Sequence, residues 1–147
     1  MKNANLLITT GDCGWLLVTK EAFRKGELVF DFSAVRPICS PTYQTIQINH
    51  DEHVLEEGIL SFMNHSCHPN VFINTELRRC FALRDIQTDQ ELTFFYPSTE
   101  WEMVRPFQCL CGYPHCIKIV SGAADLSETT LGRYKINSHI RAMKCCA

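Results

Sequence analysis

Asn64-His65-Ser66-Cys67-His68-Pro69-Asn70 is the stretch that decides the fold of this chain. It places amide, imidazole and thiol side chains within four residues and then stops on a proline, and no helical or strand periodicity requires such a run. Two further clusters follow it: Glu-Leu-Thr-Phe-Phe-Tyr at 91–96 and the cysteines of the segment 109–116. We therefore expect one site that is assembled from distant parts of the chain.

Composition narrows the class of protein. The chain has 147 residues, which fits one domain, and 46% of them are hydrophobic, which is far above the disordered range. A formal charge of −2 does not favour nucleic-acid binding, so no direct nucleic-acid partner is expected. No apolar run approaches the ~18 residues of a membrane span, and the N-terminal apolar run is too short for a signal peptide. These features predict an intracellular protein, nuclear or cytoplasmic, without a membrane partner; they do not indicate its oligomeric state.

The predicted elements are mostly short strands. Apolar, β-branched or aromatic runs predict strands at 15–19, 27–32, 44–49, 70–74, 79–84 and 91–96. Within 44–49 the alternation places Ile46 and Ile48 on one side and Thr45 and Gln47 on the other. The proline-containing segment 36–41 is expected to be a loop.

Helical signals are few and short. A helical turn is expected at 58–64, and Ser98 is expected to cap a turn that runs to residue 103. Ser127 is expected to cap a helix toward residue 134, and Asn137 or Ser138 to begin another. The fold class is therefore mainly β with few short helices. Strands without alternating long helices argue against a Rossmann-type fold.

The cysteines indicate a metal site. In a reducing compartment, clustered cysteines favour metal binding or catalysis over disulfides. Cys109-x-Cys111-x4-Cys116 supplies three thiolates, and structural zinc prefers four tetrahedral ligands. The fourth ligand must come from elsewhere: His115 is crowded by its neighbour, and Cys67 is the better candidate because it belongs to the other unusual motif. The remaining cysteines are interpreted as packing residues or, at the C-terminus, as incidental thiols: Cys13, Cys39, Cys80, Cys145 and Cys146.

Together these motifs resemble the SET-domain methyltransferases. The Asn-His motif, the strand that ends in tyrosine and the segment Cys-x-Cys-Gly-x3-Cys occur in that family's order, and Gly14-Trp15 with Lys25-Gly26-Glu27 resembles its first motif. The resemblance covers about residues 11–122. It implies a SET fold of small β-sheets with a C-terminal pseudoknot. It divides the chain into a SET domain at 1–105, a zinc-binding post-SET segment at 106–122 and a C-terminal helical extension at 123–147.

The resemblance also implies an activity. It predicts an S-adenosylmethionine-dependent enzyme that methylates lysine side chains of a protein or peptide, such as a histone. The cofactor and the lysine would enter from opposite faces through a narrow channel. Tyr96 matches the catalytic tyrosine. The positions assigned to the cofactor are Gly14, Trp15, Asn64, His65, Tyr96, Phe107 and Leu110, and those assigned to Zn²⁺ are Cys67, Cys109, Cys111 and Cys116.

The sequence departs from the family pattern at several positions. Leu16 stands where the second glycine of the first motif is usual, and Phe95 stands where aspartate often precedes the tyrosine. The insert at 41–58, which normally shapes the peptide groove, is very short. Phe94 lies two residues before Tyr96 on the same face of the strand and leaves room for methyl groups, so we expect it to allow more than one methyl transfer.

Two rival functions stay open. In the first, the chain is an enzyme that methylates a small amine or a biosynthetic peptide. In the other it would be a non-catalytic SET binding module, although the presence of Tyr96, Asn64 and His65 argues against that.

Overall fold

Several small sheets, rather than one large sheet, make up this protein. The computed structural model describes residues 5–147, so residues 1–4 of the expected SET domain lie outside the described part. Two of the sheets have three strands. The first has the order β3 (Leu28–Asp31), β9 (Arg79–Ala82), β8 (Val71–Asn74). The second has the order β4 (Arg36–Ile38), β6 (His53–Leu55), β5 (Ile46–Gln47). Three two-stranded sheets pair β1 (Leu6–Gly11) with β2 (Gly14–Thr19), β7 (Asn64–His65) with β10 (Thr93–Phe94), and β11 (Phe107–Gln108) with β12 (Ile119–Val120).

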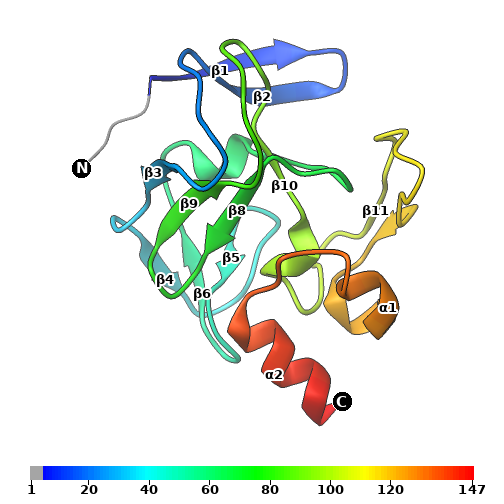
Figure 1. Cartoon of the computed structure of the whole chain (residues 1–147). Helices are drawn as coiled ribbons and strands as arrows, with labels where there is room; N and C mark the ends of the chain where they lie inside the picture. The colour runs from blue at the N-terminus through cyan, green and yellow to red at the C-terminus, as the bar shows by residue number, and fades with distance from the viewer. Residues whose placement is uncertain (1–4) are drawn as a thin grey trace.

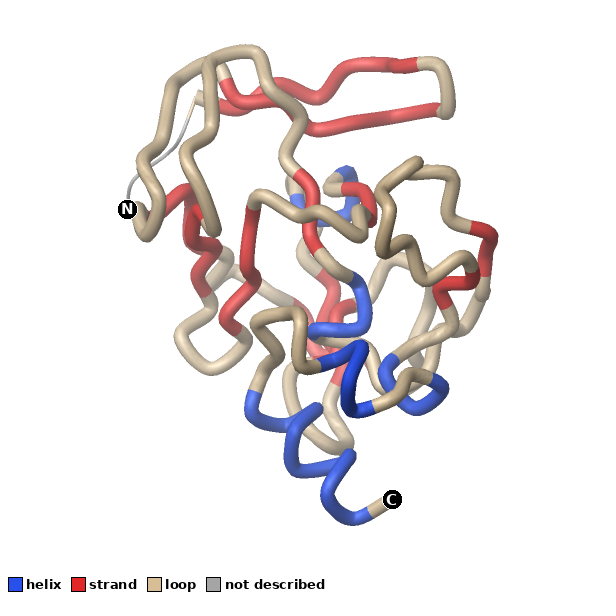
Figure 2. The backbone as a smooth tube through the Cα atoms, turned by 45° about the vertical axis from the view of Figure 1, so that its right-hand side comes forward, coloured by secondary structure: helices blue, strands red, loops and turns tan. Residues whose placement is uncertain are grey.

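The helices of the described residues are short and gather mostly at the C-terminal end of the molecule (Figures 1 and 2). Three are 3-10 helices: η1 (Leu60–Phe62), η2 (Tyr96–Ser98) and η3 (Ala123–Asp125). The two α-helices are α1 (Glu128–Leu131) and α2 (Ser138–Cys146). None of the helices in residues 5–147 is long and apolar enough to span a membrane. The prediction of a mainly β fold with few short helices is confirmed.

A main core, a satellite cluster and a small cluster around Cys67, Cys109 and Val120 stabilise these sheets. The main core contains fully buried side chains from several sheets, including Leu17, Val29, Ile73 and Leu92. The satellite cluster joins the C-terminal segment to the residue before the expected catalytic tyrosine, and it consists of Phe95, Ala123, Leu131 and Ile140. Burial of such side chains contributes about 1.5–3 kcal/mol each. The C-terminal segment is thereby packed against the turn that carries Tyr96.

Asn137 connects this C-terminal segment to the sheet. Its Nδ2 donates hydrogen bonds to the carbonyl oxygens of Ile73 and Ser98, both at 2.8 Å. Its Oδ1 accepts a hydrogen bond of 3.0 Å from the backbone N–H of Thr75. Because these partners hold the Asn137 side chain, it does not cap α2. The helix begins at Ser138, which is one of the two predicted start positions.

Several strands differ from the prediction. The strand expected at 91–96 shrinks to Thr93–Phe94, and Tyr96 begins the helix η2 instead of ending the strand. The segment 36–41 is not all loop, because Arg36–Ile38 forms β4 at the edge of its sheet, where a proline is tolerated. The β-branched run Leu6–Gly11 forms β1 and pairs with β2 along its full length, which sequence reasoning missed. The predicted strand at 44–49 shrinks to Ile46–Gln47.

Gln47 shows why the alternation at 44–49 failed. Its side chain is as buried as that of Ile46, and both faces of the short strand are covered. Its Oε1 accepts a hydrogen bond of 2.9 Å from the backbone N–H of Trp101, and its own N–H donates to Glu100 Oε1 at 2.9 Å. Tertiary hydrogen bonds therefore stabilise a buried amide where period-2 patterning predicts a solvent-facing one.

The helical predictions met mixed outcomes. Ser127 caps α1, because its Oγ accepts a hydrogen bond of 3.1 Å from the N–H of Thr130. The prediction of a turn from Ser98 to residue 103 is wrong, because η2 ends at Ser98. Pro97 lies in the first turn of η2, where its missing N–H leaves no hydrogen bond unmade. Among the cysteines expected to pack, Cys80 is fully buried, whereas Cys13 and Cys39 are exposed. Those two predictions are wrong because both lie in surface turns or loops.

Candidate methyltransferase site

The site begins with a parallel pairing of two distant segments. β7 and β10 align Asn64 with Thr93 and His65 with Phe94. Ser66 N–H extends the pairing with a hydrogen bond of 3.0 Å to the Phe94 carbonyl. The Asn-His motif therefore lies beside the strand that leads into Tyr96. This contact is the one expected if distant parts of the chain form a single site.

Asn64 is fixed through its side-chain amide. Nδ2 donates to the Trp15 carbonyl at 2.9 Å and to Glu91 Oε1 at 3.0 Å. The amide thus ties β7 to β2 and to the segment before β10. With both amide protons used, the groups of Asn64 left to meet a ligand are its backbone and its side-chain oxygen.

His65 contacts both the tyrosine turn and the cysteine cluster. Its Nδ1 accepts a hydrogen bond of 3.2 Å from the Tyr96 N–H, and its Nε2 lies 3.3 Å from Cys67 Sγ. Burial lowers the pKa of His65 to about 4, so the ring is neutral at pH 7. With Nδ1 as acceptor, the neutral ring carries its proton on Nε2 and donates it toward the sulfur.

Tyr96 is held as a protonated phenol. Its hydroxyl donates to the Met63 carbonyl at 3.0 Å. Burial, followed by the carboxylates of Glu100 and Glu91, raises its pKa to about 12. Its ring lies 4.6 Å, centroid to centroid, from that of Phe94. A phenol with this pKa orients groups through hydrogen bonds rather than acting as a base at neutral pH.

Two cavities meet at Tyr96. The first, of about 630 Å³, is lined by Asn64, His65, Phe107 and Leu110, and we call it the cofactor cavity. The second, of about 40 Å³, is lined by Met63, Phe94 and Glu100, and we call it the acceptor cavity. Four residues line both: Tyr43, Ser61, Tyr96 and Met103. A wide cavity and a narrow one thus share a boundary at the expected catalytic tyrosine.

The cofactor cavity contains some of the predicted residues but not all. Phe107 and Leu110 are 38% and 78% exposed, and apolar side chains in this state mark a surface that a ligand can cover. Gly14 and Trp15 do not line the cavity, whereas their neighbour Cys13 does. Their assignment to the cofactor stays a prediction.

Sequence reasoning missed the residues that the two cavities share. Tyr43, Ser61 and Met103 received no role. Tyr43 offered a signal, since an aromatic residue in the turn-rich segment after Pro41 has no strand pattern to explain it. Ser61 and Met103 carry no comparable signal, because only the tertiary fold brings them to Tyr96.

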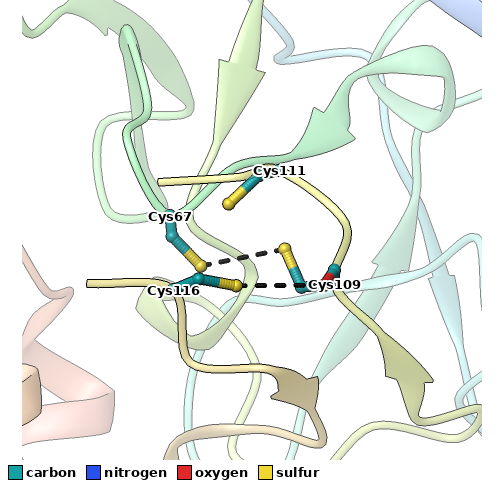
Figure 3. A group of neighbouring side chains, drawn as sticks. All are labelled: Cys67, Cys109, Cys111 and Cys116. Atoms are coloured by element: carbon teal, nitrogen blue, oxygen red, sulfur yellow. Dashed lines mark hydrogen bonds between the residues drawn. The ribbon is translucent and has the colours of Figure 1, made fainter. Parts of the chain in front are cut away.

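The four predicted cysteines converge on one point. The sulfur atoms of Cys67, Cys109, Cys111 and Cys116 all lie within 4.8 Å of one another (Figure 3). The sulfurs of Cys67 and Cys109 are 3.8 Å apart, too far for a disulfide. A zinc ion with tetrahedral bonds of about 2.3 Å to sulfur places its ligands about 3.8 Å apart. The cluster therefore fits Zn²⁺, and His115 is not part of it.

The electrostatics of the two buried cysteines, Cys67 and Cys109, also favour a cation. Burial raises the pKa of the Cys67 thiol well above its ordinary value and that of Cys109 to about 11. Thiolates in such surroundings are stable only beside a compensating positive charge. The ligands come from the 64–70 motif and the 109–116 segment, so a metal would tie these two segments together.

Comparison with known proteins identifies the family. The SET domain family matches residues 14–97. Methyltransferase flvH of Aspergillus flavus is 34% identical over 122 residues, which cover 82% of this chain and 68% of that protein. The H3 lysine-36 specific histone-lysine N-methyltransferase of Candida albicans is 39% identical over 83 residues, which cover 52% of this chain and 10% of that protein. This chain belongs to the SET domain family of methyltransferases.

Solved structures agree on the fold. The crystal structure of KRYPTONITE in complex with mCHH DNA, H3(1-15) peptide and SAH has a TM-score of 0.59 at 27% identity, over 80% of this chain and 29% of that one. The methyltransferase domain of human SETMAR has a TM-score of 0.60 at 20% identity, over 82% of this chain and 59% of that one. The predicted SET fold is confirmed, and the boundaries at 105 and 122 stay predictions.

Proposed function

We propose that this chain transfers methyl groups from S-adenosylmethionine to the side-chain amine of a lysine in a protein or peptide. The meeting of the cofactor and acceptor cavities at Tyr96 carries the proposal. Methyl transfer needs such an arrangement, since the nucleophile must approach the methyl carbon opposite the sulfur. KRYPTONITE binds SAH, the product form of this cofactor, and H3(1-15) peptide.

The residues of the cofactor cavity suit this ligand. The cofactor supplies the activated methyl group. The aromatic and aliphatic side chains of Phe107 and Leu110 would cover its adenine, and the β7 backbone at Asn64 and His65 would hold it. The Tyr96 hydroxyl, directed at the Met63 carbonyl, would lie at the boundary where the methyl group points.

The amine must lose its proton before it can attack. A free lysine has a pKa of about 10.4, and a neutral amine at pH 7 costs about 4.6 kcal/mol. A narrow, buried cavity removes water from the ammonium, which disfavours its charged form and lowers this cost. Phe94 and Met63 are almost fully buried in the acceptor wall, so they exclude water from the reacting amine.

The zinc site has a structural role in this proposal. Cys67, Cys109, Cys111 and Cys116 would hold the ion with no open position, as structural zinc sites do. The ion would supply folding free energy by fixing the segment that carries Phe107 and Leu110 next to β7.

A second candidate acceptor is a small amine. Methyltransferase flvH, whose name specifies no acceptor, matches over 82% of this chain, against 52% for the Candida histone enzyme, so the similarity does not by itself favour a histone acceptor. A histone acceptor would place the protein in the nucleus. The expectation of no nucleic-acid partner stays a prediction, and KRYPTONITE itself binds DNA.

The test uses labelled S-adenosylmethionine. The protein is incubated with histones, with a cell lysate and with free amines, and each reaction is repeated with Tyr96→Phe and Tyr113→Phe. Tyr113 lines neither cavity and makes the matched control. Label transfer that Tyr96→Phe lowers at least tenfold and Tyr113→Phe leaves unchanged supports the proposal. Calorimetry that finds no binding of the cofactor would instead support a non-catalytic module.

A further inference from the structure

A buried carboxylate in the acceptor cavity has no role so far. Glu100 is only 8% exposed and lines the cavity together with Phe94 and Tyr96. Its backbone N–H donates to the Tyr96 carbonyl at 3.0 Å, so its position is fixed relative to the tyrosine. A carboxylate this deep in a protein is rare unless it is paired.

Only one of its two oxygens is satisfied. Oε1 accepts hydrogen bonds from the Gln47 N–H at 2.9 Å and from Thr99 Oγ1 at 3.1 Å. Within residues 5–147, Oε2 accepts none. The two donors fix the orientation of the carboxylate, and the free oxygen is the group that can meet a ligand in the cavity.

Among the described residues, the side chains that line the acceptor cavity include no cation to compensate the charge of Glu100. The titratable side chains that line the acceptor cavity with Glu100 are those of Tyr43, Tyr96 and Glu102, and no lysine, arginine or histidine of the described residues is among them. Burial therefore raises the pKa of Glu100 to about 7. The hydrogen bonds from Gln47 and Thr99 lower this pKa, but their effect is smaller than that of burial. A ligand that brings a positive charge would supply the missing partner.

We propose that Glu100 binds the ammonium group of the incoming acceptor in this cavity and takes up its proton. The inference rests on the proposed function and adds a specificity-determining residue to it. The proton moves from the ammonium nitrogen to Oε2. The nitrogen lone pair then forms the bond to the methyl carbon, and the carbon–sulfur bond breaks with its electron pair left on sulfur. The proton leaves Glu100 for solvent after the methylated product departs.

Sinefungin provides a test that needs no known substrate. It is a cofactor analogue with an ammonium-bearing carbon in place of the methyl-bearing sulfur, so it directs a cation from the cofactor cavity toward the acceptor cavity. SAH lacks that group. Binding of both ligands to the full chain is measured by calorimetry at pH 8 and pH 5.5, with Glu100→Gln and, as control, the exposed Glu57→Gln.

At pH 8 we expect Glu100→Gln to weaken sinefungin binding about tenfold, the effect of losing a hydrogen bond to a charged group, and to leave SAH binding unchanged. At pH 5.5 the two proteins should bind sinefungin equally, because Glu100 is then protonated. Glu57→Gln should behave as wild type throughout.

Unchanged sinefungin affinity in Glu100→Gln, with SAH still bound, would overturn the inference and leave the proposed function standing. Equal losses for both ligands would also overturn it, since they would indicate a structural role. If wild type binds neither ligand, the proposed function fails, and the inference fails with it.

Discussion

We expect Glu100→Gln to increase the stability of the folded protein, although the same change should weaken sinefungin binding. Replacement by glutamine keeps an oxygen for the Gln47 N–H and removes the charge. The folded-state pKa of Glu100 lies above its ordinary value of 4.5, so the folded protein holds this proton more tightly than the unfolded chain does. The stability that protonated Glu100 contributes is complete below pH 4.5 and is lost as the pH rises toward 7.

The size of the effect follows from the shift. A rise from 4.5 to about 7 is roughly 2.5 pKa units, and each unit corresponds to about 1.4 kcal/mol. Above pH 7.5 the buried charge therefore costs about 3 kcal/mol of unfolding free energy. Glu100→Gln escapes this cost, so it should be more stable than wild type by up to about 3 kcal/mol at pH 8. The two proteins should be nearly equal at pH 4.5.

Urea unfolding followed by circular dichroism at pH 4.5, 6 and 8 measures the difference. The variant's advantage should grow between pH 4.5 and 7 and then stay constant, while Glu57→Gln shows no such pH dependence. A difference that is the same at all three pH values would refute the reasoning, as would a wild type that is more stable at pH 8. The result also separates binding from folding, because a more stable variant cannot lose sinefungin by unfolding.

Three further predictions concern other sites. Elemental analysis should find about one zinc per chain, and chelators should unfold the protein; well under one zinc, with folding unaffected by chelation, would contradict the metal site. Asn137→Ala should lower the unfolding free energy by about 2 kcal/mol or more in urea titrations, because it removes the side-chain partner of two buried backbone groups, the Ile73 carbonyl and the Thr75 N–H; a loss under about 1 kcal/mol would count against the role of this residue. Phe94→Tyr should shift the products toward monomethyl by narrowing the acceptor cavity, and mass spectrometry that finds only monomethyl product with wild type would refute the expectation of multiple transfer.

Motifs that carry chemistry were readable from the sequence. The Asn-His stretch, the strand into Tyr96 and the three clustered cysteines each have a local pattern, and the choice of Cys67 as fourth ligand agrees with the convergence of the sulfurs. Residues whose roles depend on tertiary partners were not readable. Gln47 lies in a strand of two residues and Glu100 in an irregular segment, and only the contact between them shows why both are buried.

The same limit explains the errors in secondary structure. Strands of two to four residues have too few positions to reveal a period, so β5 and β6 depend on pairing with each other. The exposed Cys13 and Cys39 show that a cysteine without ligand spacing is not always a packing residue. Asn137 was predicted as a helix start, and its actual partners lie about 40 and 60 residues away in the chain.

The imidazole of His65 lies between the cysteine cluster and Tyr96, which lines the cofactor cavity. One nitrogen contacts the Cys67 sulfur and the other accepts a hydrogen bond from the Tyr96 N–H, so the order that a metal would impose on the thiols would reach the cofactor cavity through this ring. Two ligands coupled in this way increase each other's affinity by the same factor. Chelation or oxidation of the thiols would therefore weaken cofactor binding. Saturating cofactor would in turn slow the loss of zinc.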